Sequence, residues 1–190
     1  VEAASVQALR DHAEAILAAG KDLVALSVGA LADAPFRDRL LELARRAGRR
    51  IRVPSGALFG LDNLKVARLC GVDELILRTT KPPRSLDAGV SERALLFRGS
   101  AAESIERYPR NVNSAVAVSL AAGREVTVEL WVDPSLSRIR HELLIRGGFG
   151  EARIRVDNVP SPDNPSTSYL AALSVLSLLD GLDAPLSVGT

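Results

Sequence analysis

The stretch Leu23-Val-Ala-Leu-Ser-Val28 decides the fold class, because a nearly continuous apolar run is typical of a β-strand covered on both faces. A helix with Ser5 as its N-cap precedes the run, and a second helix with Asp33 as its N-cap follows it. Ile51–Val53 then forms another short strand. Helix, strand, helix and strand in this order predict a parallel sheet with crossover helices, the back half of a doubly wound sheet.

After Gly56 the pattern changes to mostly strands. Three segments carry an alternating apolar face, at 126–132, 139–145 and 152–156. Asp133-Pro-Ser135 and Gly147-Gly148 lie between them as turns, so we expect an antiparallel meander with one apolar face buried in the core. Further strands are expected at 74–80 and 94–98, and helices at 61–70, at 113–122, at 168–180 and after the capping box Ser100–Glu103.

Composition argues against several classes of protein. The 24 Lys+Arg residues balance 23 Asp+Glu residues, and no aromatic residues alternate with basic ones, so no nucleic-acid partner is expected. The longest apolar stretch, 169–179, is shorter than the roughly 20 residues that cross a bilayer. The single Cys70, which we expect to be buried on a helix, forms no intrachain disulfide and favours a cytoplasmic location. The two histidines and this cysteine lie far apart, so no metal site is predicted.

His141 lies on the apolar face of its predicted strand, between Ile139 and Leu143. One interpretation is a core histidine that makes a single hydrogen bond. The other is a general base or a substrate-orienting donor, because imidazole titrates near neutral pH. The pattern leaves both open, whereas His12 lies on a polar helix face and is expected to be solvated.

Asn111 and Asn113 flank the start of a predicted helix. Asparagine is a favoured N-cap, so one of the two has a capping role. The second has no capping role left, and its carboxamide offers the donor and acceptor that match a planar amide such as nicotinamide. A cap and a ligand contact both remain open for Asn113.

Two further segments are suited to a ligand. Ser55-Gly-Ala57 follows a parallel strand, where open α/β sheets bind ligands, and Gly56 would let a ligand approach the backbone. Asn164-Pro-Ser-Thr-Ser168 supplies amide and hydroxyl groups at a helix start, which suits an anion. An ordinary turn and an ordinary helix cap explain the same residues, so neither segment is specific alone.

A set of motifs in a fixed order resembles the L-aspartate dehydrogenase family, its archaeal branch in particular. The resemblance covers essentially the whole chain. The motifs are Leu26-Ser-Val-Gly-Ala-Leu31, Pro54-Ser-Gly-Ala57, Gly60-Leu-Asp62, Thr79-Thr-Lys-Pro-Pro83, Phe97-Arg-Gly-Ser100, Tyr108-Pro-Arg-Asn-Val-Asn113, Asp133-Pro134, His141-Glu142, Gly148-Phe-Gly150 and Asn164-Pro-Ser-Thr-Ser168.

The resemblance implies a fold and an activity. The fold is α/β: the remainder of a Rossmann-type domain at 1–54, an α+β domain with a largely antiparallel sheet for catalysis and oligomerisation at 55–165, and a helix at 166–190 that packs back on the first domain. The activity is oxidation of L-aspartate to iminoaspartate with NAD or NADP. Iminoaspartate then reaches quinolinate synthase in NAD biosynthesis, or hydrolyses to oxaloacetate and ammonia. A homodimer is also implied.

The same resemblance assigns roles to residues. His141 falls on the family's catalytic histidine, and Ala57 and Asn113 fall on positions that contact the cofactor. The carboxylates of the substrate need donors, and four residues are candidates: Lys81, Asn164, Thr167 and Ser168.

The start of the chain keeps other hypotheses open. Family members begin with a strand and a Gly-rich dinucleotide loop, whereas this sequence starts at Val1-Glu-Ala-Ala-Ser5, so we expect an N-terminal truncation of at least a βαβ unit of roughly 30 residues. A non-catalytic remnant that dimerises or binds a dicarboxylate is therefore the alternative. A dehydrogenase for another amino or hydroxy acid is the third hypothesis.

Overall fold

The computed structural model describes residues 1–83, 90–108, 112–164 and 167–188. Its first part contains α1 (Val6–Ala18), β1 (Leu23–Val24), the 3₁₀ helix η1 (Val28–Ala32), α2 (Ala34–Ala47) and β2 (Ile51–Arg52). Strands β1 and β2 pair in parallel, as predicted. The side chains of Ser5 and Asp33 cap α1 and α2 by accepting hydrogen bonds from the amides of Ala8 and Phe36, so both predicted N-caps are confirmed.

The predicted strand at 23–28 is wrong in its second half. Only Leu23 and Val24 pair with β2, and η1 begins at Val28. Between them, the amide and the hydroxyl of Ser27 both donate to the buried carboxylate of Glu2, at 3.1 and 2.9 Å. These bonds hold the backbone away from the sheet, and continuous apolarity does not distinguish a strand from another buried segment.

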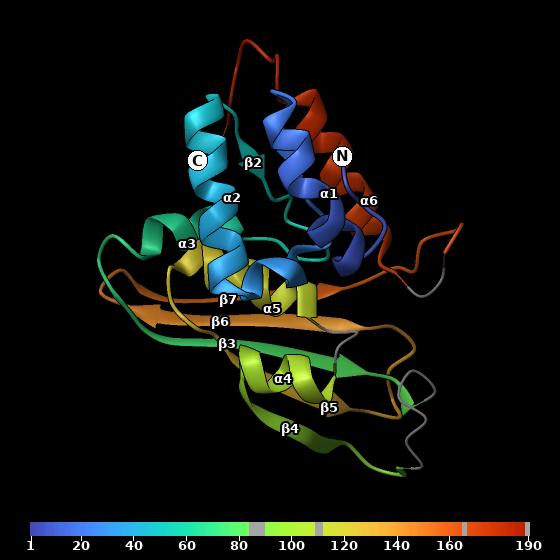
Figure 1. The fold of residues 1–190 in the computed structure, drawn as a ribbon. Helices are drawn as coiled ribbons and strands as arrows, with labels where there is room; N and C mark the ends of the chain where they lie inside the picture. Colours follow the sequence, from blue (N-terminus) through green and yellow to red (C-terminus); the bar gives the residue numbers. More distant parts are fainter. Residues whose placement is uncertain (84–89, 109–111, 165–166, 189–190) are drawn as a thin grey trace.

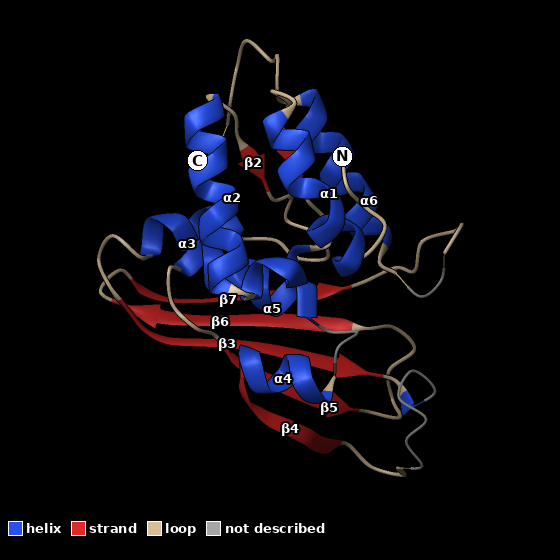
Figure 2. Ribbon diagram, in the orientation of Figure 1, coloured by secondary structure: helices blue, strands red, loops and turns tan. Residues whose placement is uncertain are grey.

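A five-stranded sheet forms the second part of the molecule (Figures 1 and 2). Its strands are β3 (Val72–Lys81), β4 (Ala94–Ser100), β5 (Thr127–Val132), β6 (Arg140–Gly147) and β7 (Gly150–Asp157), in the spatial order β4-β5-β3-β6-β7. The β3–β5 pair is parallel and the other three pairs are antiparallel. The predicted fold class, a parallel-sheet part followed by a largely antiparallel sheet, is therefore confirmed.

The predicted meander is wrong for its first pair. Strand β3 lies between β5 and β6, so Asp133-Pro-Ser135 does not form a hairpin turn. The connection instead crosses the end of β3, where the amide of Asp133 donates to the carbonyl of Lys81 at 3.0 Å. Only β6 and β7 form the expected hairpin, with Gly147 opposite Gly150. Alternation along a strand shows which face is buried but not which strand is its neighbour.

The remaining helices are α3 (Leu61–Ala67), α4 (Ala101–Arg107), α5 (Val112–Ala122) and α6 (Tyr169–Asp180). Helix α5 belongs to both hydrophobic cores: Val116 and Ala117 pack with α1, η1 and α2, whereas Ala115, Val118 and Ala122 pack on the five-stranded sheet. Its small apolar residues therefore join the two parts, and they place the start of α5 against η1.

Helix α3 ends before the predicted limit at residue 70. Cys70 lies beyond its end and is exposed, so the expectation of a buried cysteine is wrong. No helix within the described ranges is long and apolar enough to cross a membrane.

Candidate active site

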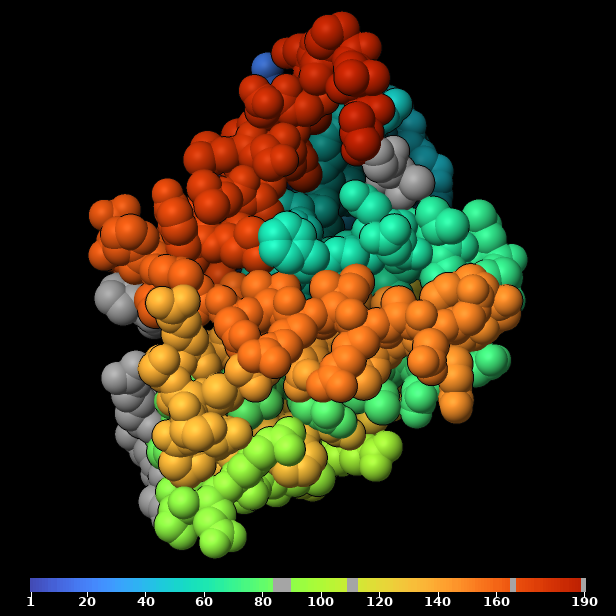
Figure 3. All heavy atoms as spheres, turned by 180° about the vertical axis from the view of Figure 1, so that it is seen from behind, coloured from blue at the N-terminus to red at the C-terminus, as the bar shows by residue number. Residues whose placement is uncertain are grey.

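A cavity of about 980 Å³ lies where the turn after β2, the ends of β3 and β6, and the start of α6 meet. Seen from behind, the C-terminal segment (red) lies next to the chain that follows β2 (cyan) on this side of the molecule (Figure 3). All seven residues predicted from the sequence line the cavity: Ala57, Lys81, Asn113, His141, Asn164, Thr167 and Ser168. Lys81 and Arg138 are the ionised side chains among the described lining residues, which include no carboxylate. The cavity is therefore suited to an anion.

The turn Ser55–Ala57 is fixed by groups from the C-terminal part of the chain. Gly56 has a φ of 64°, and its amide donates to the hydroxyl of Ser174 in α6 at 3.0 Å. The carbonyl of Ala57 accepts a hydrogen bond from Asn158 Nδ2 at 3.3 Å. A Cβ atom at Gly56 would meet nothing within 4 Å, so the turn leaves open space beside its backbone. A ligand would contact the turn through that space rather than through the Gly56 amide.

Asn158 joins three walls of the cavity and is itself buried. Besides its bond to Ala57, its Oδ1 accepts a hydrogen bond from the hydroxyl of Ser168, at the start of α6. Its backbone amide donates to the carbonyl of Ile139, directly before β6, at 2.8 Å. Loss of this side chain would therefore loosen the turn after β2 and the start of α6 together.

Asn113 lies in the first turn of α5 and contacts η1. Its Oδ1 accepts a hydrogen bond from the amide of Gly29 at 2.8 Å. The side-chain oxygen therefore accepts a hydrogen bond from the protein, and the Nδ2 group has two hydrogens to donate to a ligand. Asn111, the alternative cap, lies outside the described residues.

His141 is half-buried in the cavity wall, opposite Thr79 in the pairing of β3 and β6. Its Nδ1 lies 3.0 Å from Thr79 Oγ1. Burial lowers the pKa of His141 to about 4, and the nearby ammonium group of Lys81 acts in the same direction. The free ring is therefore neutral at physiological pH, and a neutral imidazole is able to accept a proton.

Of the segment predicted to form a helix cap, the structure describes Asn164, Thr167 and Ser168. Ser168 occupies the N-cap position of α6, but its side chain makes no capping hydrogen bond, and its hydroxyl donates to Asn158 Oδ1. The amide of Thr167 donates to the carbonyl of Asn164 at 3.0 Å, and both residues line the cavity.

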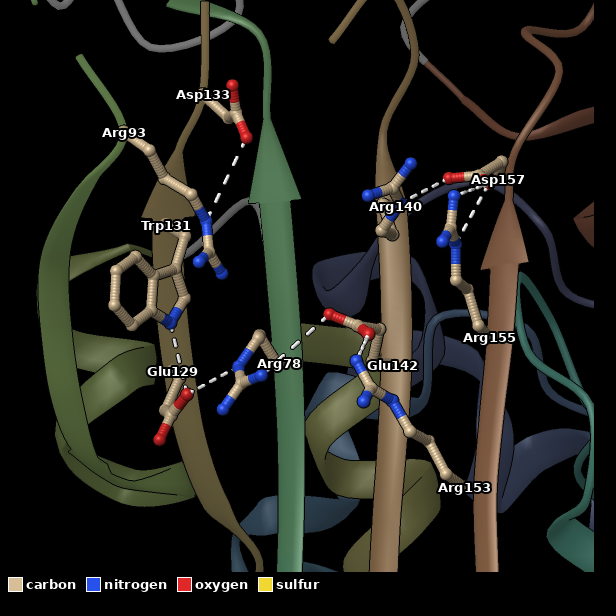
Figure 4. Close-up of polar contacts among 10 residues, drawn as sticks. All are labelled: Arg78, Arg93, Glu129, Trp131, Asp133, Arg140, Glu142, Arg153, Arg155 and Asp157. Carbon is tan, nitrogen blue, oxygen red and sulfur yellow. Dashed lines mark hydrogen bonds and ion pairs between the residues drawn. The ribbon is translucent and has the colours of Figure 1, made fainter. Parts of the chain in front are cut away.

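The opposite face of the sheet carries a network of ion pairs (Figure 4). Glu129, which is 5% exposed, accepts hydrogen bonds from Arg78 Nε at 2.7 Å and from Trp131 Nε1 at 3.0 Å. Burial acts to raise the pKa of Glu129, but these two hydrogen bonds together with the positive charges of Arg78 and Arg98 outweigh it, so the pKa lies below its usual value. Glu142, also buried, accepts from Arg153.

Four residues of the site were not predicted from the sequence: Thr79, Arg138, Asn158 and Ser174. Thr79 could have been found as the partner of His141 only if the register of β3 and β6 were known. Arg138 had one available signal, its position three residues before His141.

Two family models match the chain. The model described as "Aspartate dehydrogenase, C-terminal" matches residues 62–182, and the model described as "Homoserine dehydrogenase, NAD binding domain" matches residues 1–54.

Individual relatives match the whole chain. L-aspartate dehydrogenase of Methanospirillum hungatei is 56% identical over 190 residues, which cover 100% of this chain and 75% of the relative. The enzyme of the same name from Methanothermobacter thermautotrophicus is 46% identical, with 100% and 74% covered. The crystal structure of aspartate dehydrogenase from Thermotoga maritima superposes with a TM-score of 0.89 at 29% identity, covering 99% of this chain and 77% of that one.

Proposed function

The chain belongs to the aspartate dehydrogenase family of NAD(P)-dependent oxidoreductases, and we propose that the cavity around His141 is where L-aspartate is oxidised to iminoaspartate. One observation carries this assignment. A neutral imidazole shares the cavity with two cationic side chains, Lys81 and Arg138, and with no carboxylate among the described lining residues. A dicarboxylate with an amino group is the substrate that uses all three groups.

The lining residues fit the nicotinamide end of the cofactor. Small side chains such as Ala57 and Ala117 and the open space beside Gly56 leave room for a flat ring. The Nδ2 donors of Asn113 would hold the carbonyl oxygen of its carboxamide. When bound, NAD or NADP supplies the acceptor for the hydride that leaves the substrate Cα.

His141 acts on the amino group of the substrate. Aspartate binds as an ammonium ion, and its nitrogen needs a free electron pair before the hydride can leave Cα. The neutral ring accepts one proton from the ammonium group, and the nitrogen pair then forms the C=N bond as the hydride departs with its two electrons. The products are the protonated imine, the reduced cofactor and one proton on His141.

The substrate carboxylates bind at the cationic side of the cavity. Lys81 and Arg138 supply the charge, and Asn164 and Thr167 supply polar groups at the rim, whereas Ser168 donates its hydroxyl hydrogen to Asn158. Burial is the larger cause of the lowered pKa of His141 and the Lys81 ammonium group is the smaller one, and the negative charge of the carboxylates would offset the second.

We extend the proposal to the organisation of the enzyme. Residues 1–54 form the cofactor domain, 55–165 serve catalysis and oligomerisation, and 166–190 pack back on the first domain. The Gly56–Ser174 hydrogen bond joins α6 to the turn that directly follows β2. Iminoaspartate passes in the cytoplasm to quinolinate synthase or hydrolyses to oxaloacetate and ammonia.

A homodimer is the proposed assembly. Ile76, Trp131 and Leu144 are half-buried on the sheet face that bears the ion pairs, and a second copy would cover them. A mass near twice 20.2 kDa in light scattering would support the dimer, and the mass of one chain would reject it.

The activity is tested by initial rates of NAD(P) reduction with L-aspartate, L-glutamate and L-malate. The proposal expects L-aspartate to have the highest kcat/KM, and a preference for L-malate would show a hydroxy-acid dehydrogenase instead. Calorimetry with NAD and NADP separates an enzyme from a non-catalytic remnant, because micromolar binding excludes the remnant.

A further inference from the structure

Thr79, which is buried, and His141, which is half-buried, form a pair across two hydrogen-bonded strands. They are register partners in the β3–β6 ladder, with Arg78 opposite Glu142 on one side and Thr80 opposite Arg140 on the other. Thr79 is 4% exposed. Since the ladder fixes the register, the Oγ1–Nδ1 distance of 3.0 Å is set by the sheet and not by a mobile loop.

This contact leaves a single ring nitrogen for the substrate. Nδ1 of His141 is engaged by Thr79, so Nε2 is the atom that remains for a ligand. A neutral imidazole carries one N–H, and Nε2 accepts a proton only when that hydrogen is on Nδ1. A threonine hydroxyl both donates and accepts, so the contact at Nδ1 is compatible with either tautomer, and only the one in which Nδ1 donates to Thr79 Oγ1 leaves Nε2 able to accept a proton.

We propose that Thr79 is a positioning residue for His141: its hydroxyl oxygen accepts the Nδ1–H and so leaves the Nε2 electron pair free for the amino group of the substrate. The inference rests on the proposed role of His141 in the proton transfer. After the transfer both ring nitrogens carry hydrogen, and Thr79 Oγ1 still accepts from Nδ1, so the same contact serves both states of the ring.

A hydroxyl differs from a carboxylate at this position in one respect. A carboxylate would stabilise the imidazolium by charge and raise the pKa of the ring, whereas a hydroxyl orients the ring without a charge. The charged groups that line the described cavity around His141 are Lys81 and Arg138, both cations. Thr79 therefore sets the tautomer, and the ring stays neutral until the anionic substrate arrives.

Three variants test the inference. Thr79→Val keeps the shape of the side chain and removes the oxygen, Thr79→Ser keeps the oxygen, and Thr80→Val changes an equally buried neighbour on the opposite face of the sheet. We expect kcat to fall at least about tenfold in Thr79→Val, with the Kd for NAD(P) unchanged. Thr79→Ser should stay within about threefold of wild type, and Thr80→Val should keep wild-type kcat.

Nitrogen NMR provides a readout that a purely structural role would not change. The chain has two histidines, so ¹⁵N-histidine labelling gives two rings to assign, with exposed His12 as the reference. We expect His141 to carry its hydrogen on Nδ1 in the wild type and to lose that preference in Thr79→Val.

Two results would overturn the inference: an Nε2–H tautomer in the wild type, or wild-type kcat in a folded Thr79→Val. Failure of the proposed function is distinguishable, because it would appear as wild-type turnover in a variant that lacks His141 itself.

Discussion

The backbone amide of Gly56 donates a 3.0 Å hydrogen bond to the hydroxyl of Ser174, 118 residues later in the chain. The Ser174 hydroxyl in turn donates to the carbonyl of Ala171 at 2.7 Å, so it is held on α6 in the orientation that accepts from the turn. The turn after β2 and helix α6 therefore form one wall of the cavity.

Replacement of Ser174 by alanine should weaken that wall. The half-buried amide of Gly56 would lose its partner, which costs up to about 1–3 kcal/mol. We expect Ser174→Ala to lower the free energy of unfolding in urea by that amount and to raise the KM for NAD(P). Ser177→Ala, at an exposed position of the same helix, should leave both unchanged. Equal unfolding free energies for Ser174→Ala and wild type would show that this hydrogen bond does not stabilise the fold.

The two cationic residues of the cavity should bind the substrate rather than the cofactor. Lys81→Met and Arg138→Met should each raise the KM for L-aspartate about tenfold or more, because a charge-assisted contact to a carboxylate is worth about 1.5–3 kcal/mol. The KM for NAD(P) should change less than twofold. Lys65→Met, at a residue outside the cavity lining, is the control. Identical KM values for L-aspartate in wild type and both variants would place the carboxylates elsewhere.

The lowered pKa of His141 links stability to pH. Its pKa is about 4 in the folded protein against an ordinary 6.5, so between these values the unfolded chain binds a proton that the folded protein does not. Stability from this residue is therefore complete above about pH 6.5 and declines as the pH falls toward 4, by up to about 3 kcal/mol. Urea unfolding of wild type and His141→Asn across this range isolates the effect. Parallel curves for the two proteins would show that the ring is not held neutral.

The ion pairs on the opposite face should stabilise the fold without affecting chemistry. Glu129→Gln should lower the unfolding free energy by about 1–3 kcal/mol at neutral pH, because Arg78 and Trp131 would lose a charged acceptor. The pKa of Glu129 is lowered in the folded state, so this difference should shrink as the carboxylate is protonated in acid. Glu14→Gln removes an exposed pair with Arg39 and should cost less than about 0.5 kcal/mol. A fall in kcat of folded Glu129→Gln would contradict the assignment of a purely structural role to this face.

Sequence patterns predicted what is local in this molecule. Caps at Ser5, Asp33 and Ser100 and the hairpin at Gly147-Gly148 depend on neighbouring residues, and the structure has all of them. The end of β1 could not be predicted in this way, because the carboxylate of Glu2 holds Ser27 from 25 residues away.

Strand order and the supports of the site were also beyond local patterns. Strand β3 lies between β5 and β6 because the connection from β5 to β6 crosses the end of β3. The alternation of apolar residues along a single strand does not indicate such a crossing. For the same reason His141 could be placed on an apolar face, whereas its partner Thr79 could not be identified. The cavity residues that were predicted from the sequence lie in motifs, whereas Asn158 and Ser174, which hold the turn after β2 in place, could be identified only from the structure.

The measurement that tests the central claim most directly is the turnover of His141→Asn with saturating L-aspartate and NAD(P), beside wild type and His12→Asn. His12 is exposed on α1, outside the cavity lining, and serves as the matched control. The account predicts that kcat falls at least about a hundredfold in His141→Asn, with NAD(P) still bound, and that His12→Asn equals wild type. Wild-type kcat in His141→Asn would contradict it.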